Sequence, residues 1–229
     1  MGVGRTFVVL ISDDHQFIFV HIPKTAGSSI TQVLEPVSRC GSEFWLTRWL
    51  LRAGVRSNLF APPKYRTYRR HTSARKLQWY LPRRQFQQYY KFAFVRNPWD
   101  WLVSYYHFVM GQPNHRRYRQ LKSLGSFEHF VEYECSQKKF MQKNFVTDHQ
   151  GNLIVDFVGR FENLMEDFAL VCHKLNITGS LGQRNRSQHR DYRSYYSDRA
   201  IELVAQGYAE DIQLFGYTYD GVQCNRKVA

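Results

Sequence analysis

The stretch that decides the fold is FIFVHIPKTAGSSI, residues 17–30, in which an apolar segment runs into a turn that contains a lysine, a glycine and two serines. The apolar residues predict a buried β-strand, and the serines predict the start of a helix. Backbone N–H groups at the start of a helix and the helix dipole both favour a bound anion. The turn from Lys24 to Ser29 is therefore predicted to hold a phosphate group.

The same order of strand, turn and helix occurs again further along the chain. KFAFV, residues 91–95, predicts a second buried strand, and Asn97 and Pro98 are typical N-cap and first residues of the helix that follows. IVDFVGRF, residues 154–161, predicts a third strand before a helix over residues 162–175. This repetition predicts an α/β domain around a central parallel sheet.

Two further features complete the predicted architecture. A last helix is expected to start at a cap on Ser197 and to run through residues 198–215, whereas only short helices are expected in 39–84 and 110–152. No repeat, low-complexity tract or linker interrupts the chain. Residues 1–229 are therefore expected to form a single domain.

Composition narrows the class of protein. The chain has 229 residues, of which 43% are hydrophobic, enough to bury a full core. Its four cysteines form no C-x-x-C pair, so neither a disulfide framework nor a zinc site is indicated. No apolar window approaches the ~20 residues of a membrane span, and no signal peptide or anchor is recognisable. These features favour a cytoplasmic protein, or one of the Golgi lumen if the chain is a truncated form.

Positive charge is concentrated in one segment. The chain has a net charge of +13, and residues 64–84 contain eight Lys or Arg and no Asp or Glu. Such a segment favours an anionic partner, with Arg69, Arg70 and Arg75 as candidate contacts. Tyrosines alternate with the arginines, a pattern that also suits nucleic acid. A non-catalytic polyanion or nucleic-acid binder is therefore an alternative.

The phosphate-binding turn differs from the Walker A loop. Lys24 comes three residues before Gly27, whereas a Walker A lysine directly follows the second glycine. Thr25, Ser28 and Ser29 offer hydroxyl donors, and no Asp follows a clear strand as a magnesium ligand would. This pattern predicts a phosphate donor that works without a metal. A P-loop-like kinase and a simple Gly-Ser turn with a surface lysine remain the alternatives.

A second phosphate-binding element is predicted after the second strand. Arg96 follows that strand directly, and Ser104 lies about two turns into the next helix. Ligands of open α/β sheets bind outside the carboxyl ends of parallel strands, where Lys24 and Arg96 are both expected. A guanidinium and a hydroxyl can together bind a phosphate.

Five motifs, in order along nearly the whole chain, resemble the sulfotransferase family 2 domain. They are HIPKTAGSS, FAFVRNPWDWLVSYYHF, VGRFENLMEDF, NRSQHRDYRSYYSD and YAEDIQLFGY. That family contains carbohydrate sulfotransferases such as the heparan 2-O and chondroitin 4-O enzymes. The resemblance implies a P-loop-like, three-layer α/β fold. It also implies transfer of a sulfuryl group from 3'-phosphoadenosine 5'-phosphosulfate (PAPS) to a carbohydrate hydroxyl, which leaves adenosine 3',5'-bisphosphate (PAP) without using a metal.

The resemblance also implies roles for individual residues. The 3'-phosphate is expected to contact Arg96 and Ser104, and a loop around Arg186 and Ser187 is expected to close over the donor. Related enzymes often have lysine where this chain has Arg186, which keeps the charge but leaves its role open. The residues expected to hold the 5'-phosphosulfate are Lys24, Thr25, Ala26, Gly27, Ser28 and Ser29.

The reaction also needs a group that takes the acceptor's proton, and a neutral histidine is the usual one. His71 lies in the basic segment, before a short helix that Thr72 is expected to cap, whereas His21 is expected to pack behind the turn. Related 2-O enzymes have an essential histidine between the phosphosulfate loop and the second strand. His71 is therefore the predicted base and His189 the alternative, with Lys24 stabilising the leaving phosphate. The expected acceptor is a glycan, most simply an anionic polysaccharide, rather than a nucleic acid.

Overall fold

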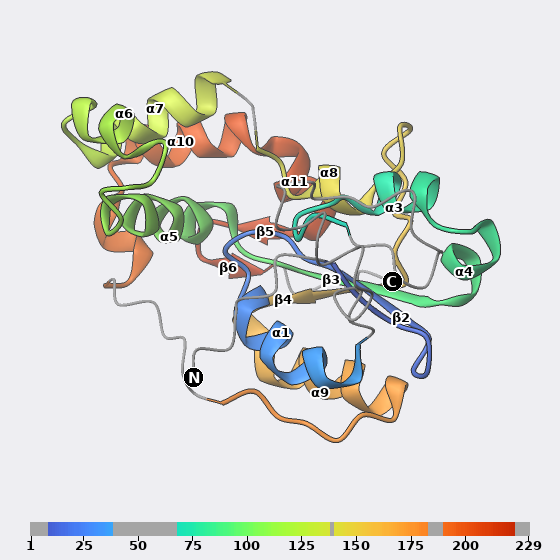
Figure 1. Ribbon diagram of the computed structural model, residues 1–229. Coiled ribbons are helices and arrows are strands. Elements are labelled where there is room, and N and C mark those ends of the chain that lie inside the picture. Colours follow the sequence, from blue (N-terminus) through green and yellow to red (C-terminus); the bar gives the residue numbers. More distant parts are fainter. Residues whose placement is uncertain (1–8, 39–67, 138–139, 183–189, 223–229) are drawn as a thin grey trace. The chain divides into compact units, whose positions relative to one another are not determined.

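The computed structural model describes residues 9–38, 68–137, 140–182 and 190–222 (Figure 1). The strands are β1 Leu10–Ser12, β2 Phe17–Val20, β3 Tyr90–Val95, β4 Phe157–Arg160, β5 Tyr217–Thr218 and β6 Gly221–Val222. The α-helices are α1 Gly27–Leu34, α3 Ala74–Tyr80, α4 Arg83–Gln88, α5 Pro98–Met110, α6 Tyr118–Ser123, α7 Phe127–Gln137, α8 Lys143–Val146, α9 Leu164–Leu175, α10 Asp198–Gly207 and α11 Ala209–Phe215. Short 3₁₀ helices span Glu35–Val37, Phe161–Asn163 and Tyr192–Tyr195.

The chain divides into two compact units, and neither is continuous in sequence. The described part of the first unit comprises residues 9–38, 68–94 and 144–182, and that of the second comprises residues 95–137, 140–143 and 190–222. The first unit therefore contains the larger sheet and the second contains helices α5–α7, α10 and α11. A single domain over residues 1–229 stays a prediction.

The first unit is built on a four-stranded sheet in the order β1-β2-β3-β4. Strands β2, β3 and β4 are parallel, with Phe17 opposite Tyr90 and Val20 opposite Ala93 in the β2–β3 register. The predicted α/β class with flanking helices is confirmed. The sheet is nevertheless mixed, because β1 pairs antiparallel with β2 through a tight turn. This edge hairpin was not predicted, although the apolar residues before the turn are typical of a strand.

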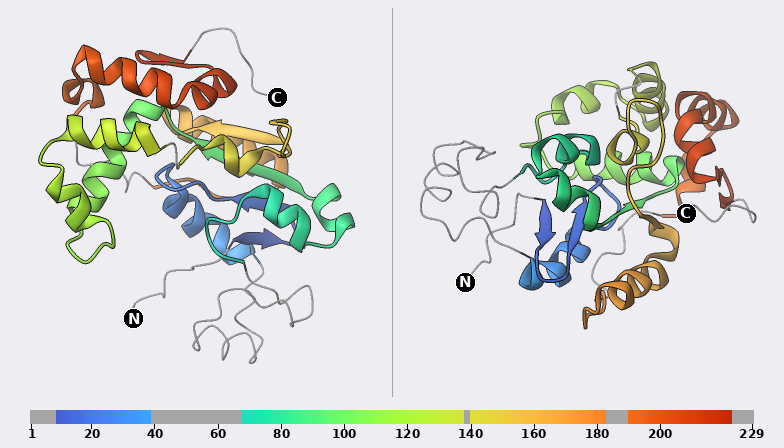
Figure 2. Two further views of the ribbon diagram at one scale, coloured as in Figure 1. Left: turned by 90° about the horizontal axis from the view of Figure 1, so that it is seen from above. Right: turned by 90° about the vertical axis from the view of Figure 1, so that its right-hand side faces the viewer.

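Helices cover both faces of this sheet. Phe17, Phe19, Phe92 and Phe94 pack with α1 and α9 in one apolar cluster, because alternate residues of a strand face the same side. On the opposite face, the ammonium of Lys91 lies over the ring of Phe86 in α4. Figure 2 shows the same arrangement from two further directions, with α1 and α9 on one side of the strands and α3 and α4 on the other. Both faces of the strands are thus buried, as their continuous apolar sequence requires.

Local sequence signals located the starts of two helices correctly. Asn97 accepts a hydrogen bond from the N–H of Trp99 and Pro98 is the first residue of α5, as predicted. Ser197 likewise accepts from the N–H of Ala200 at the start of α10.

The predicted last helix is wrong as a single element. It divides into α10 and α11 at Tyr208, whose φ of −115° and ψ of 20° leave the helical region. The break follows Gly207, where a side-chain Cβ would stand 2.9 Å from the Cβ of Cys135 in α7. Glycine allows this close approach but favours the helix poorly, so the helix ends there. Val204 and Tyr208 are still buried in the apolar cluster of the second unit.

Candidate functional site

The turn between β2 and α1 has a strained backbone. Lys24 has φ of 66° and Ala26 has φ of 60°, both in the left-handed region that side chains larger than glycine rarely adopt. Such conformations cost ~1–3 kcal/mol each and concentrate at binding sites. Left-handed residues beside the start of a helix turn successive N–H groups toward one point, where an anion can bind. We refer to residues 24–29 as the anion loop.

The hydroxyl groups of the anion loop have different surroundings. Thr25 is completely buried and its hydroxyl donates to the carbonyl oxygen of Ile22 at 3.0 Å, so this side chain holds the turn. Ser28 is exposed, and its hydroxyl accepts a hydrogen bond from Arg70 at 3.3 Å. Ser29 is buried in the first turn of α1. Ser28 is therefore the hydroxyl of this loop that is most open to a ligand.

His21 packs directly behind the anion loop, as expected. His21 is 5% exposed, and its ring stacks on that of Phe19 with the centroids 5.5 Å apart. A Cβ on Gly27 would lie 1.9 Å from the Nε2 atom of His21. The histidine ring thus leaves room only for glycine at position 27. Contact with the ring also limits how closely the anion loop can approach it.

Arg70 connects this histidine to the loop. Its Nε donates to Nδ1 of His21 at 2.8 Å, and its Nη2 donates to the hydroxyl of Ser28. A nitrogen that accepts carries no proton, so His21 is neutral with its hydrogen on Nε2. Burial, and then the charge of Arg70, hold the pKa of His21 well below its usual value. These bonds bring the charge of Arg70 to the anion loop, and its predicted contact with the acceptor stays a prediction.

His71 lies beside this network. Its Nδ1 is 3.0 Å from the carbonyl oxygen of His21, and the two rings meet edge to face with centroids 4.7 Å apart. A carbonyl can only accept, so Nδ1 donates and the neutral ring keeps its lone pair on Nε2. Desolvation is the main cause that lowers the pKa of His71; the carbonyl bond opposes it, and the charge of Arg70 adds to it. His71 is thus neutral at pH 7 and can take a proton on Nε2.

The remaining part of the basic segment lies along α3. Thr72 does not cap this helix as predicted: Ser73 is the N-cap residue, and the Thr72 hydroxyl donates to the carbonyl of Arg69 at 2.6 Å. Arg69 is exposed, and Arg75 donates to Nδ1 of His149 at 3.3 Å. Trp79 lies one turn after Arg75 and is 81% exposed. An indole open to solvent next to basic side chains was not singled out from the sequence.

The second predicted phosphate element belongs to the second unit. Arg96 is only 3% exposed, and its Nε donates to Asp100 at 2.7 Å, one turn along the chain. Ser104 is buried one further turn along α5. The Arg96–Asp100 pair was missed, although its spacing of four residues was visible in the sequence.

Other predicted features lie outside this description or are not tested by it. Arg186, Ser187 and His189 lie outside the described residues. Within the described ranges, no three His, Cys, Asp or Glu side chains gather so that they could hold a metal ion. None of the helices described is both long and apolar enough to cross a membrane.

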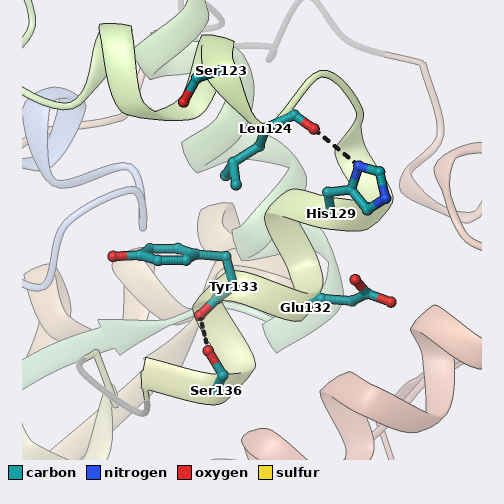
Figure 3. A pocket seen from close by; sticks show the side chains of 6 residues that line it. All are labelled: Ser123, Leu124, His129, Glu132, Tyr133 and Ser136. Carbon is teal, nitrogen blue, oxygen red and sulfur yellow. Dashed lines mark hydrogen bonds between the residues drawn. The ribbon is translucent and has the colours of Figure 1, made fainter.

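A shallow hollow of about 640 Å³ lies elsewhere, between α6 and α7 in the second unit (Figure 3). Its side chains already serve the local structure, since Nδ1 of His129 donates to the carbonyl of Leu124 at 2.9 Å and Glu132 pairs with Arg199. It contains none of the residues predicted from the sequence. We therefore place the candidate site at the anion loop.

Comparison with known proteins identifies the family. The model of the sulfotransferase family matches residues 8–218. Carbohydrate sulfotransferase 12 of Xenopus laevis is 22% identical over 253 aligned positions, which cover 91% of this chain and 60% of the frog protein. An uncharacterized protein of Archaeoglobus fulgidus is 36% identical over 113 residues, 47% of this chain and 86% of the archaeal protein. This chain thus spans less than two thirds of the frog relative. Because the family model covers nearly all of it, the chain belongs to the sulfotransferase family.

Proposed function

We propose that this protein transfers a sulfuryl group from PAPS to a hydroxyl of a carbohydrate. The observation that carries the proposal is the arrangement around His21: its ring supports a strained, lysine-containing anion loop, and its carbonyl fixes the tautomer of His71. A loop that binds an anion and a neutral histidine that accepts a proton are the two groups that sulfuryl transfer to a hydroxyl requires.

In this proposal His71 is the general base. Nε2 takes the proton of the acceptor hydroxyl as its oxygen bonds to sulfur and the bond from sulfur to the phosphate oxygen breaks. The carbonyl of His21, bound to Nδ1, holds the ring in the tautomer that can accept and stabilises the imidazolium that forms. Lys24 stabilises the negative charge that remains on the departing phosphate.

In this proposal the donor contacts two sets of residues, those of the anion loop and the pair Arg96 and Ser104. We assign the 5'-phosphosulfate to the N–H groups and hydroxyls of Lys24 through Ser29. Arg70, held at the loop by its hydrogen bond to Ser28, adds positive charge. The 3'-phosphate is assigned to Arg96 and Ser104. Arg186 and Ser187 keep their proposed role as a closing loop. No protein group in this scheme needs a metal.

The name of the frog relative supports a carbohydrate acceptor. Arg69 and Arg75 present positive charge that suits an anionic polysaccharide, and the exposed indole of Trp79 offers a flat apolar surface for a sugar ring. A cytoplasmic location stays a prediction.

The test uses the purified protein with radiolabelled PAPS and a panel of desulfated and native glycosaminoglycans. We expect label to pass to at least one glycan, with no change on addition of EDTA. His71→Ala should lose ~10² or more in turnover, within the range for a general base, and retain wild-type affinity for PAP. His173→Ala, which removes an exposed histidine from α9, is the matched control and should remain fully active.

The pH dependence separates His71 from Lys24. The wild-type rate should rise with pH through the lowered pKa of His71, below 6.5, and this limb should vanish in His71→Ala. Full activity of His71→Ala combined with loss in His189→Ala would move the base to His189. A magnesium requirement would favour the kinase, and binding of nucleic acid with no transfer to any glycan would favour the non-catalytic binder.

A further inference from the structure

Arg96 is held at its backbone by a side chain 46 residues away. Its N–H donates to Oε1 of Gln142 at 2.9 Å, and its carbonyl oxygen accepts from Nε2 of the same side chain at 2.7 Å. Both peptide groups of Arg96 are therefore paired with one amide. Gln142 is 1% exposed, so water does not compete for these bonds.

Gln142 is itself fixed by a buried carboxylate. Asp211, in the first turn of α11, is 0% exposed; it accepts from the N–H of Gln142 at 2.7 Å and from the N–H of Lys143 at 2.8 Å. Its two oxygens thus hold two successive peptide groups. A continuous series of hydrogen bonds runs from Asp211 through Gln142 to Arg96.

The next residue is anchored in the same manner. Nδ2 of Asn97 donates to the carbonyl of Thr218 at 2.8 Å, while its Oδ1 caps α5. On the other side, Asp100 holds the guanidinium of Arg96 through Nε. Backbone and side chain of Arg96 are thus each held by groups of the second unit.

We propose that Gln142, supported by Asp211, is a positioning residue that sets the direction of Arg96 and thereby the selectivity for a 3'-phosphate on the nucleotide. The inference rests on the proposed function of Arg96. Its chemical basis is that an amide both donates and accepts, so it can pair with an N–H and a C=O at once. A guanidinium selects a phosphate by directed hydrogen bonds, so a change in the direction of the Arg96 backbone weakens those bonds.

The test compares the affinities of PAP and AMP, which differ in the 3'-phosphate, by isothermal titration. Wild type should prefer PAP, and Arg96→Ala should reduce the PAP-to-AMP affinity ratio by at least ~10-fold, as for hydrogen bonds to a charged group. Gln142→Glu has the same shape but puts a second acceptor against the carbonyl of Arg96. It should reduce the ratio by a similar factor while the AMP affinity stays close to that of wild type.

Gln142→Met removes both bonds at similar volume, and Asp211→Asn replaces one acceptor of the supporting carboxylate. Both should lower the same ratio, whereas Gln112→Met, on an exposed glutamine of the same unit, should not. In the double variant Gln142→Glu, Arg96→Ala, the ratio should not fall below that of Arg96→Ala alone.

The possible failures are distinct. If wild type binds PAP and AMP equally, the assignment of the 3'-phosphate to Arg96 falls, and this inference with it. The second failure begins with an Arg96→Ala variant that loses the preference for PAP. If folded Gln142→Glu and Asp211→Asn then keep that preference, or lose affinity for PAP and AMP equally, Gln142 has only a structural role. In that case the role of Gln142 is overturned, whereas the assignment of the 3'-phosphate to Arg96 stands.

Discussion

Substitution of Gly27 by alanine tests the contact on which the anion loop rests. The new Cβ would stand 1.9 Å from Nε2 and 2.1 Å from Cδ2 of His21, so the ring or the loop must move by about 1.5 Å to reach ordinary contact at 3.4 Å. The ring cannot move freely, because Arg70 binds Nδ1 and both Phe19 and His71 pack against it. The loop is therefore expected to move.

The magnitude follows from two opposing effects. Overpacking a filled site costs ~1–3 kcal/mol, whereas alanine in place of glycine at a helical position gains ~0.5–1 kcal/mol. We expect Gly27→Ala to lower the free energy of unfolding by about 1–2 kcal/mol, measured by urea denaturation. A loop displaced by more than an ångström should also lose a charged hydrogen bond to the nucleotide, which lowers the affinity for PAP by ~10-fold or more.

Two controls make this prediction specific. Gly182→Ala places its Cβ in open space and should change stability by no more than ~0.5 kcal/mol. His21→Ala removes the obstructing ring, so the double variant Gly27→Ala, His21→Ala should be more stable than the sum of the single effects predicts, by ~0.5–3 kcal/mol. If Gly27→Ala is as stable as Gly182→Ala and its effect adds to that of His21→Ala, the proposed contact is refuted.

Three further predictions concern stability and can be measured by urea denaturation. Ala26→Gly should raise stability by ~0.5–1 kcal/mol, because relief of a left-handed alanine, ~1–2 kcal/mol, exceeds the entropic cost of glycine; a loss would contradict the strained backbone. As pH falls below 6.5, His21 binds a proton in the unfolded chain but stays neutral in the folded one, so the free energy of unfolding should fall. The fall per pH unit should be smaller in His21→Gln, and an equal fall in both proteins would contradict the lowered pKa of His21. Glu134→Ala leaves Arg117 without its buried partner and should cost ~3–5 kcal/mol, whereas Glu132→Ala, from a more exposed pair, should cost at most ~1 kcal/mol; similar losses in both would contradict the difference in burial.

Much of the secondary structure in both units follows from local sequence. Strands β2, β3 and β4, the helices after them and the caps at Asn97 and Ser197 lie close to where the patterns of residues 16–30, 91–110 and 154–175 predict them. These features depend on side-chain period and on contacts a few residues apart, which the sequence displays directly. The position of Lys24 in a turn before a helix belongs to the same class.

Other features required the folded chain. The antiparallel β1 and the division of α10 from α11 were not predicted, because strand pairing and the approach of Gly207 to Cys135 depend on segments that are distant in sequence. A family resemblance points to His71 as the base, but the carbonyl of His21 that fixes its tautomer lies 50 residues away in the sequence.

The same holds for the groups that orient the site. Arg70 looked like one more cation of a basic segment, yet its bonds to His21 and Ser28 join it to the anion loop. Nothing around Gln142 indicated that its amide would pair with both peptide groups of Arg96. Periodicity records which side of an element a residue faces, whereas a hydrogen bond across 46 residues depends on how those elements pack, and only the tertiary structure decides that.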